Sequence, residues 1–288
     1  MNKINWPNKK HESLIFLHIP KAAGTTLMTI LDRQYEPDVI FSTYGSKRDQ
    51  EGVDKLKKLP EDQREKIRVL RGHLPFGVHT FLPQTSHYFT ILRDPIERTI
   101  SHYYFVLKTT RHYLHDRVTS QNMTLKDYVS NGIDTELDNG QTRVISGVGH
   151  TVGFGQCSTE MLETAKKHLS EMLVVGLSER FDETVILLKR NFGWKLPFYI
   201  KANVTENRPR REDISKDTLA AIERCNELDF ELYRYAQELF EERIRQQPPA
   251  FERELKRFRF LNKFFGGPYL ILRHRVGCFL KRAKEWGK

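Results

Sequence analysis

Short apolar runs that alternate with amphipathic stretches predict an α/β fold. Leu14–Leu17 is apolar throughout, as expected of a strand that is buried on both faces. Ile67–Leu70, Tyr88–Leu92 and Leu173–Leu177 are similar runs, and Phe198–Val204 is either a further strand or an extended loop. Strands separated by helices form mostly parallel sheets. We therefore expect a three-layer fold with a central, mostly parallel sheet flanked by helices.

Amphipathic helices are predicted between and after these strands. Leu27, Ile30 and Leu31 share one face at helical spacing directly after the first strand. Asp94 is a suitable N-cap for a second helix over Pro95–Leu107, which begins with proline. The other predicted helices are Phe181–Phe192, Ser215–Cys225 and Leu228–Arg245, and Pro60–Lys66 is a charged helical stretch. The ligand of such a fold binds beyond the carboxyl ends of the strands.

A Gln-Gln-Pro-Pro sequence at 246–249 marks a boundary near the end of the chain. We expect residues 1–13 to be a flexible N-terminus, residues 14–247 to form one domain, and residues 248–288 to form a basic, aromatic-rich tail. Positions 251–288 hold eleven Lys or Arg and three Glu, most of the net charge of +10. Basic residues interleaved with aromatic ones suit peripheral contact with a membrane surface. A packed C-terminal helix with solvated charges is the alternative.

The positive net charge favours anionic partners, namely nucleotides, nucleic acids, sulfated or carboxylated glycans, or a membrane surface. No RNA- or DNA-binding motif is recognisable, so nucleic acid is not expected. The three cysteines, Cys157, Cys225 and Cys278, are far apart, which disfavours a disulfide framework or a zinc site and suits a reducing compartment. No signal peptide is evident. We expect a cytoplasmic protein, with membrane association through the tail as an option.

The loop after the first strand has the composition of an anion site. Its residues 18–26 read His-Ile-Pro-Lys-Ala-Ala-Gly-Thr-Thr, so Lys21 supplies a charge, and Thr25 and Thr26 supply hydroxyl groups. A turn that opens a helix also presents backbone N–H groups and the positive end of the helix dipole. A Walker A loop has its lysine after the second glycine, whereas Lys21 precedes Gly24, so a nucleoside triphosphatase is disfavoured.

This loop resembles the 5′-phosphosulfate loop of the carbohydrate sulfotransferases that include the heparan sulfate 2-O- and 6-O-sulfotransferases. The usual pattern is H-I-P-K-T-G-G-T-[ST], and Ala22 and Ala23 stand here where Thr and Gly are common. A hydroxyl is lost at position 22, and we expect one phosphate contact to be weaker for that reason. The resemblance implies a P-loop-like fold with 3′-phosphoadenosine 5′-phosphosulfate (PAPS) as co-substrate and no metal. It assigns the following residues to the nucleotide: Lys21, Ala22, Ala23, Gly24, Thr25 and Thr26.

A second motif resembles the family's 3′-phosphate site, R-D-P-x-x-R-x-x-S. Arg93 stands at the end of a predicted strand, and Ser101 follows two turns along the next helix. Arginine suits forked contacts with phosphate oxygens. The likeness spans roughly residues 14–240 and includes a loop in which Thr205 and Arg208 are candidate nucleotide contacts, with a solvated loop as the alternative. It also covers the segment of Arg143, for which acceptor binding and an internal salt bridge are both open.

The resemblance further implies in-line attack of an acceptor hydroxyl on sulfur, with Lys21 stabilising the leaving oxygen. A histidine is the side chain best suited to accept the hydroxyl proton near neutral pH. His73 is our choice, because it follows a predicted strand and matches a G-H position where the 2-O-sulfotransferases have a catalytic histidine. His79 and His102 are the runners-up, and some relatives use glutamate. His18 is expected to shape the loop.

Two other functions are compatible with these patterns. One is a phosphate-binding, kinase-like transferase, which would need acidic residues for Mg²⁺. The other is a non-catalytic protein that binds polyanions through its basic surface. If the resemblance holds, the acceptor is a carbohydrate or a glycolipid. Golgi members of the family carry an N-terminal membrane helix that this sequence lacks, so a bacterial enzyme is our expectation. The oligomeric state is not indicated.

Overall fold

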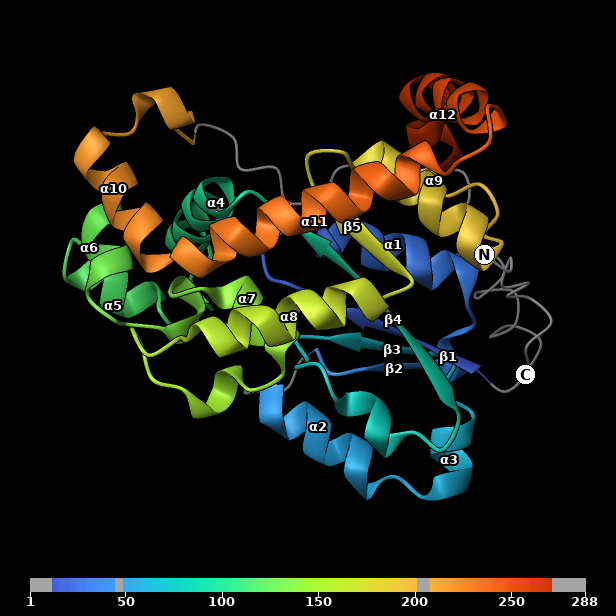
Figure 1. The fold of residues 1–288 in the computed structure, drawn as a ribbon, viewed down its shortest axis with the longest axis horizontal. Helices are drawn as coiled ribbons and strands as arrows, with labels where there is room; N and C mark the ends of the chain where they lie inside the picture. Colours follow the sequence, from blue (N-terminus) through green and yellow to red (C-terminus); the bar gives the residue numbers. More distant parts are fainter. Residues whose placement is uncertain (1–11, 45–48, 201–207, 271–288) are drawn as a thin grey trace, which may run out of the picture.

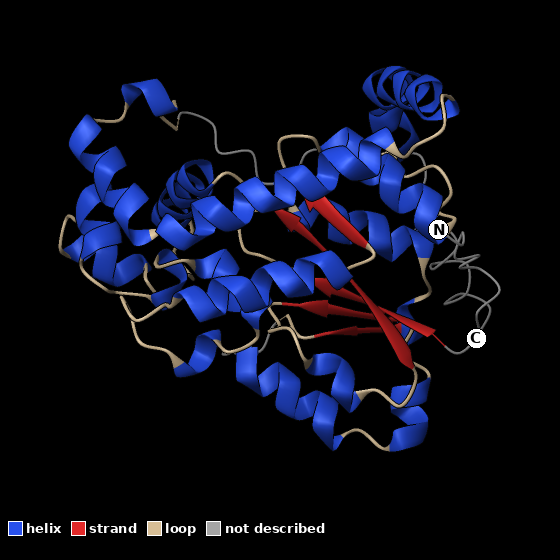
Figure 2. Cartoon of the chain, viewed as in Figure 1, coloured by secondary structure: helices blue, strands red, loops and turns tan. Residues whose placement is uncertain are grey.

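A five-stranded parallel sheet forms the centre of the computed structural model, which describes residues 12–44, 49–200 and 208–270 (Figure 1). Its strands are β1 (Glu12–Leu17), β2 (Ile40–Ser42), β3 (Val69–Gly72), β4 (Thr85–Leu92) and β5 (Val174–Leu177). They lie in the order β2-β3-β1-β4-β5, and every pairing is parallel. Helices cover both faces (Figure 2), so the predicted three-layer α/β fold is confirmed.

The strand register brings several loops together at one edge of the sheet. Leu17 at the end of β1 lies opposite Gly72 of β3 and Thr90 of β4, and Leu92 pairs with Leu177 of β5. The segments that follow β1, β3, β4 and β5 therefore start from the same edge. The carboxyl edge is where ligands bind in sheets of this kind.

The α-helices of the described residues are numbered in chain order. α1 spans Gly24–Gln34, α2 Asp49–Lys58, α3 Glu61–Glu65, α4 Pro95–Lys108, α5 His115–Ser120, α6 Leu125–Ser130, α7 Gly140–Ser146, α8 Thr159–Glu171, α9 Phe181–Phe192, α10 Lys216–Cys225, α11 Glu227–Arg245 and α12 Ala250–Leu261. The predicted N-cap of α4 is confirmed, because the side chain of Asp94 accepts a hydrogen bond from the backbone N–H of Glu97 at 3.0 Å.

Two apolar cores hold these elements together. The larger one contains the four long strands and the inner faces of α1, α9, α11 and α12. The smaller one lies between α4, α5, α6 and α10, with Ile100, Tyr128 and Ile222 almost fully buried. The second core gives the helices between β4 and β5 a fixed shape, with α10 from later in the chain packed against them.

The structure differs from the sequence-based expectations at several strands, and β4, for example, begins at Thr85 and not at Tyr88. β3 begins at Val69 and not at Ile67, because the backbone N–H of Ile67 is bonded to Arg64 at the end of α3. β2 is an additional, three-residue strand. Residues 198–200 are not part of a strand, and the rest of the predicted element, to Val204, lies outside the described residues.

The first part of the C-terminal tail is helical. α12 packs against α9 and buries Phe251, Leu255 and Phe258 in the main core. The packed-helix alternative therefore describes these residues. None of the helices in the described part of the chain is long and apolar enough to cross a bilayer.

Candidate functional site

A cavity of about 810 Å³ opens at the carboxyl edge of the sheet. Nine of the residues predicted to form a site line it: Lys21, Ala23, Gly24, Thr25, Thr26, His73, Arg93, Ser101 and Arg208. Ala22 belongs to the main core and is 1% exposed, so its side chain does not reach the cavity. Thr205 lies outside the described residues. The elements that supply the lining are far apart in sequence, and the sheet brings them together.

The loop between β1 and α1 is held in a tight, unusual conformation. Lys21 and Ala23 have φ angles of 65° and 62°, in the left-handed region that non-glycine residues rarely occupy. The side chain of Ala23, the N-cap of α1, offers no hydrogen bond to the helix. The N-terminus of α1 therefore opens on the cavity without a capping side chain, an arrangement that favours an anion.

Gly24 packs closely against His18, and both residues line the cavity. A Cβ atom at Gly24 would lie 1.8 Å from Nε2 of His18, so no larger residue fits without movement of the ring. His18 stacks on Phe16 at 5.5 Å, and its Nδ1 is hydrogen-bonded to the hydroxyl of Tyr44. Burial, and then the charges of His73 and Lys21, hold the pKa of His18 well below its usual value. A neutral His18 therefore supports the loop.

His73 lies beside this support, directly after β3. Its ring stacks on His18 with the centroids 4.6 Å apart and meets Tyr44 edge-on at 5.3 Å. Nδ1 of His73 is buried and has no hydrogen-bond partner among the described residues. A buried polar atom without a partner costs free energy. The ring is thus fixed by packing, the residue lines the cavity, and Nδ1 is left without a hydrogen bond in the described part of the chain.

Two cations, Lys21 in the loop and Arg93 after β4, lie next to one another at the cavity. The ammonium of Lys21 is 3.7 Å from the centroid of the Phe105 ring. Burial, and then the charge of Arg93, lower the pKa of Lys21 to about 8, although Glu136 acts in the opposite sense. The guanidinium of Arg93 donates to the carbonyl of Lys21 at 2.9 Å. The loop and the second motif are therefore directly joined.

Carboxylates on the rim balance these charges. Glu97 lies 3.6 Å from Arg93 and is also paired with Arg208, and Glu179 lies 4.0 Å from Arg93. Ser101, which is 8% exposed, reaches the same cavity from α4. Arg93, Ser101 and Arg208 thus form one basic and polar corner.

The backbone of Arg93 is held by a chain of hydrogen bonds from α11. The side-chain amide of Gln141 accepts from the N–H of Arg93 at 3.0 Å and donates to its carbonyl at 2.9 Å. Asp229 of α11, fully buried, accepts from the backbone N–H groups of Gln141 and Thr142 at 3.0 and 2.7 Å. The carboxylate therefore caps α7, and α7 positions Arg93.

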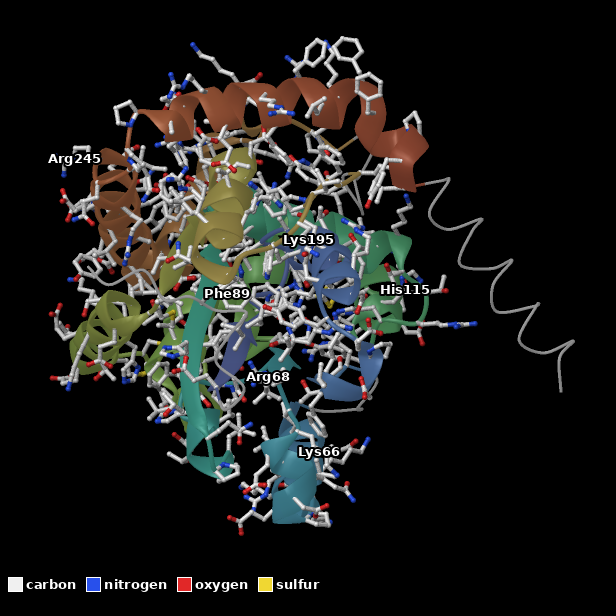
Figure 3. All side chains as sticks on the ribbon, turned by 90° about the vertical axis from the view of Figure 1, so that its right-hand side faces the viewer. Lys66, Arg68, Phe89, His115, Lys195 and Arg245 are labelled. Carbon is white, nitrogen blue, oxygen red and sulfur yellow. The ribbon has the colours of Figure 1, made fainter. Side chains whose placement is uncertain are left out.

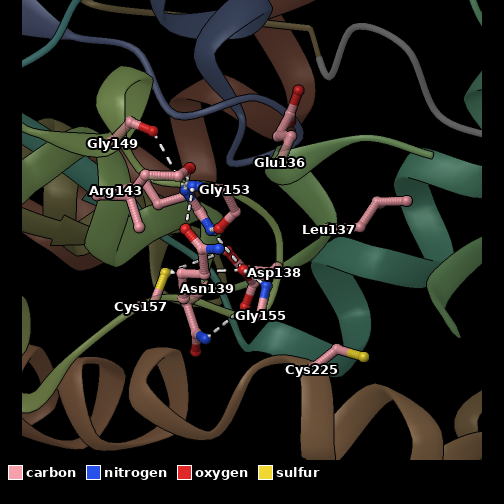
Figure 4. A network of polar contacts seen from close by, with 12 residues as sticks. Glu136, Leu137, Asp138, Asn139, Arg143, Gly149, Gly153, Gly155, Cys157 and Cys225 are labelled. Carbon is pink, nitrogen blue, oxygen red and sulfur yellow. Dashed lines mark hydrogen bonds and ion pairs between the residues drawn. The ribbon is translucent and has the colours of Figure 1, made fainter. Parts of the chain in front are cut away.

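Arg143 does not reach the cavity, which corrects its assignment to the acceptor. Its guanidinium is 4% exposed and uses all five donors: Nε–H on the Asp138 carbonyl at 2.7 Å, the NH1 group on the Gly149 and Val152 carbonyls at 3.1 and 2.6 Å, and the NH2 group on the Asp138 carboxylate and the Gly153 carbonyl (Figure 4). No donor remains for a ligand. The internal salt bridge, the other interpretation, describes this residue.

The sequence patterns did not single out Glu136, a carboxylate that also lines the cavity. Arg98, which is buried, donates to the Glu136 carboxylate at 2.9 Å and to its carbonyl at 3.2 Å. The same guanidinium donates through Nε to the carbonyl of Pro20 in the loop at 3.2 Å. Glu136 stands on a 3₁₀ turn in a stretch without periodicity, so only its tertiary contacts reveal it.

The two other histidines named as candidate bases are both hydrogen-bonded within the protein, and of the two only His102 lines the cavity. Nδ1 of His102 is hydrogen-bonded to the Tyr128 hydroxyl at 2.7 Å, and burial lowers the pKa of His102 to about 4 against the influence of Glu136. His79 bonds through Nδ1 to the hydroxyl of Tyr88 at 2.9 Å and is not part of the cavity lining. Within the described ranges, no cluster of three His, Cys, Asp or Glu side chains could hold a metal ion.

Comparisons with known proteins place these features in context. A family model described as "Sulfotransferase family" matches residues 8–236. Human heparan-sulfate 6-O-sulfotransferase 1 is 28% identical over 202 residues, which are 61% of this chain and 47% of the relative. The enzyme of the same name from Cricetulus griseus is 27% identical over 216 residues, 66% of this chain and 51% of the relative. The chain thus spans about half the length of the curated relatives it matches.

Among solved structures, mouse sulfotransferase SULT7A1 complexed with PAP aligns with 87% of this chain and 90% of its own, at 14% identity and a TM-score of 0.29. The family model and the two relatives confirm the resemblance of the chain to the carbohydrate sulfotransferase family.

Substitution of Gly24 tests the packing of the loop on His18. Gly24→Ala should lower the free energy of unfolding by about 1–3 kcal/mol, because the new methyl group overlaps the buried ring. Gly267→Ala is the matched control, since a Cβ there meets nothing within 4 Å and the residue has a helical φ of −61°. Thermal and urea unfolding measure both variants, and equal stability of the two would contradict this account.

Proposed function

The chain belongs to the sulfotransferase family, and from this premise we propose that it transfers the sulfuryl group of PAPS to a hydroxyl of a carbohydrate acceptor. One observation carries the proposal: a single cavity collects the loop with Lys21, the corner with Arg93 and Ser101, and the ring of His73. Each of these parts has a task in sulfuryl transfer, and none of the three requires a metal ion.

The two ends of the nucleotide would be held by different elements. The 5′-phosphosulfate would lie at the N-terminus of α1, where backbone N–H groups, Thr25 and Thr26 surround an anion. The 3′-phosphate would lie against Arg93 and Ser101, the residues of the second motif. The hydrogen bond from Arg93 to the carbonyl of Lys21 supports a fixed spacing between the two sites.

Transfer would proceed by in-line displacement at sulfur. The acceptor oxygen forms a bond to sulfur while the bond from sulfur to the bridging oxygen breaks, and adenosine 3′,5′-bisphosphate leaves with the electron pair. The ammonium of Lys21 would stabilise the charge that develops on the bridging oxygen. Positioning and charge stabilisation supply most of the rate acceleration in the related phosphoryl transfers.

His73 would accept the proton of the acceptor hydroxyl. Its ring is fixed between His18 and Tyr44, and its buried Nδ1 has no partner in the described part of the chain. Glu136 also reaches the cavity, but its carboxylate is already engaged by Arg98. A base needs a lone pair that is not already used, and the engagement of Glu136 by Arg98 favours His73 over Glu136.

The acceptor class is proposed from the relatives. Both are named for transfer to the 6-hydroxyl of heparan sulfate, and a carbohydrate hydroxyl is the common denominator that we extend to this chain. Because the match covers about half of each relative, the position of the acceptor hydroxyl is left open.

Binding of adenosine 3′,5′-bisphosphate tests the nucleotide assignment. The wild-type protein should bind it without metal and more tightly than AMP, and Arg93→Met should weaken this binding about 10- to 100-fold through loss of charge-assisted hydrogen bonds. The same substitution should weaken the binding of AMP only slightly, because AMP lacks the 3′-phosphate. Arg245→Met, on the exposed end of α11, is the matched control. Calorimetry that shows a preference for ATP with Mg²⁺ would instead favour a kinase-like transferase.

Replacement of His73 tests the base. His73→Ala should reduce transfer of labelled sulfuryl from PAPS to glycan acceptors by about 100-fold or more, while affinity for adenosine 3′,5′-bisphosphate changes little. His79→Ala, outside the cavity, should retain near wild-type turnover. Full activity of the His73 variant, or its loss in the His79 variant alone, would disprove the assignment.

The lowered pKa of Lys21 makes nucleotide affinity depend on pH. Lys21 is a cation below its pKa of about 8 and loses its charge above it, so affinity for the bisphosphate should fall as the pH rises through this value. Lys21→Arg keeps the charge throughout and should remove the alkaline decline. Titrations between about pH 7 and about pH 9.5 measure this, and a flat wild-type profile would contradict it.

A further inference from the structure

The exposed apolar side chains of the protein are concentrated in one region. Of the large hydrophobic residues that are exposed in the described part, five lie on the segment before residue 201 or on α12 and the π-helical turn after it: Leu196, Ile200, Phe260, Phe264 and Phe265. The three phenylalanines are 54–58% exposed. Apolar side chains gathered in this way mark an interaction surface more often than scattered ones do.

The two segments touch, so they form one region of the surface. The ring of Phe198 stacks on Phe258 of α12 at 6.0 Å. The backbone N–H of Tyr199 donates to the side-chain oxygen of Asn262 at 2.8 Å. Tyr199 also lines the cavity, so this region borders the candidate site.

The orientation of α12 is fixed from its inner side. Phe251, Leu255 and Phe258 are buried against the domain. Ion pairs at both ends hold the helix on α9, from Glu254 to Arg190 at 2.9 Å and from Arg259 to Glu183 at 2.9 Å. The opposite face must therefore point away from the protein, and α12 forms the upper margin of the molecule in Figure 3.

This outer face combines cations with aromatic rings. The residues that repeat there at helical spacing are Arg253, Lys256, Arg257, Phe260, Lys263 and Phe264, and all are exposed. The four basic residues make no ion pair within the described ranges, and Glu252 is the exposed acid beside them. We call these six residues the outer stripe of α12.

We propose that the outer stripe of α12 docks on an anionic membrane surface. Phenylalanine rings gain free energy when they enter the boundary between headgroups and acyl chains, and basic residues beside them pair with acidic headgroups. A soluble polyanion would satisfy the cations but leave Phe260 and Phe264 in water. The proposal does not depend on the transferase function.

Flotation with lipid vesicles tests the proposal on the full chain. The protein should bind vesicles of phosphatidylcholine with about 30% phosphatidylglycerol and bind pure phosphatidylcholine much more weakly. Phe260→Ser combined with Phe264→Ser should reduce binding about tenfold or more, and Arg257→Glu should do the same and reduce the salt dependence, because fewer cations then pair with the headgroups. Both changes are at exposed positions, so the melting temperature should be unchanged.

Two matched variants provide the controls. Val148→Ser removes an exposed apolar side chain elsewhere, and Lys167→Glu reverses an exposed charge on α8, and neither should alter vesicle binding. The proposal would be overturned if the variant with both phenylalanines replaced bound vesicles as well as the wild-type protein does. Light scattering that shows a dimer dissociated by the same variant, without vesicle binding, would overturn it in favour of a second copy of the chain.

Discussion

Arg98 is the largest fully buried side chain in the described part of the protein, and its charge has to be neutralised in an interior of low dielectric. The guanidinium meets this requirement with three groups from distant segments: the carbonyl of Pro20, the carbonyl of Glu136 and the carboxylate of Glu136. A Cβ at Gly140 would lie 2.7 Å from its NH2 group, so α7 approaches it only because it starts with glycine. The loop after β1, the turn with Glu136 and α7 are thereby fixed around one cation.

The cations of the cavity depend on this arrangement in turn. Arg93 is bonded to the loop through the carbonyl of Lys21, and its own backbone is held by Gln141 of α7. Asp229 caps α7 from α11, and burial raises the pKa of this carboxyl group, although its hydrogen bonds with Gln141 and Thr142 act against the increase. Donors fixed before a ligand arrives need no reorganisation during a reaction, which is the main source of electrostatic catalysis. The buried hydrogen bonds that stabilise the fold thus also fix the positions of Lys21 and Arg93 in the cavity.

Local sequence signals predicted the parts of this system that are determined locally. The strands follow from apolar runs, α4 from its Asp94 cap, and α9 from Phe181 to Phe192 from its periodicity. The positions of Lys21 and Arg93 followed from motifs at the ends of strands. Arg143 and Glu136 were not predictable in this way. The environment of Arg143 comes from carbonyls on a loop up to ten residues away, and that of Glu136 from Arg98, 38 residues away. Burial of a charge depends on tertiary contacts that a local pattern does not contain.

The acidic residues of the basic corner explain how like charges can be kept close together. Burial, and then the charge of Arg208, lower the pKa of Arg93, while Glu179 and Glu97 oppose the shift. Glu97 is paired with both arginines and so holds them at one corner without a ligand. An entering phosphate would then compete with Glu97 for cations that are already in place. The binding free energy of the phosphate would then be the difference between the new ion pairs and those that Glu97 already makes. This difference is smaller than the sum of the new contacts. Binding would, however, cost less entropy, because the two long arginine side chains are already ordered. Such a site binds phosphate less tightly but holds its cations in a fixed geometry. In-line transfer requires a fixed geometry of this kind.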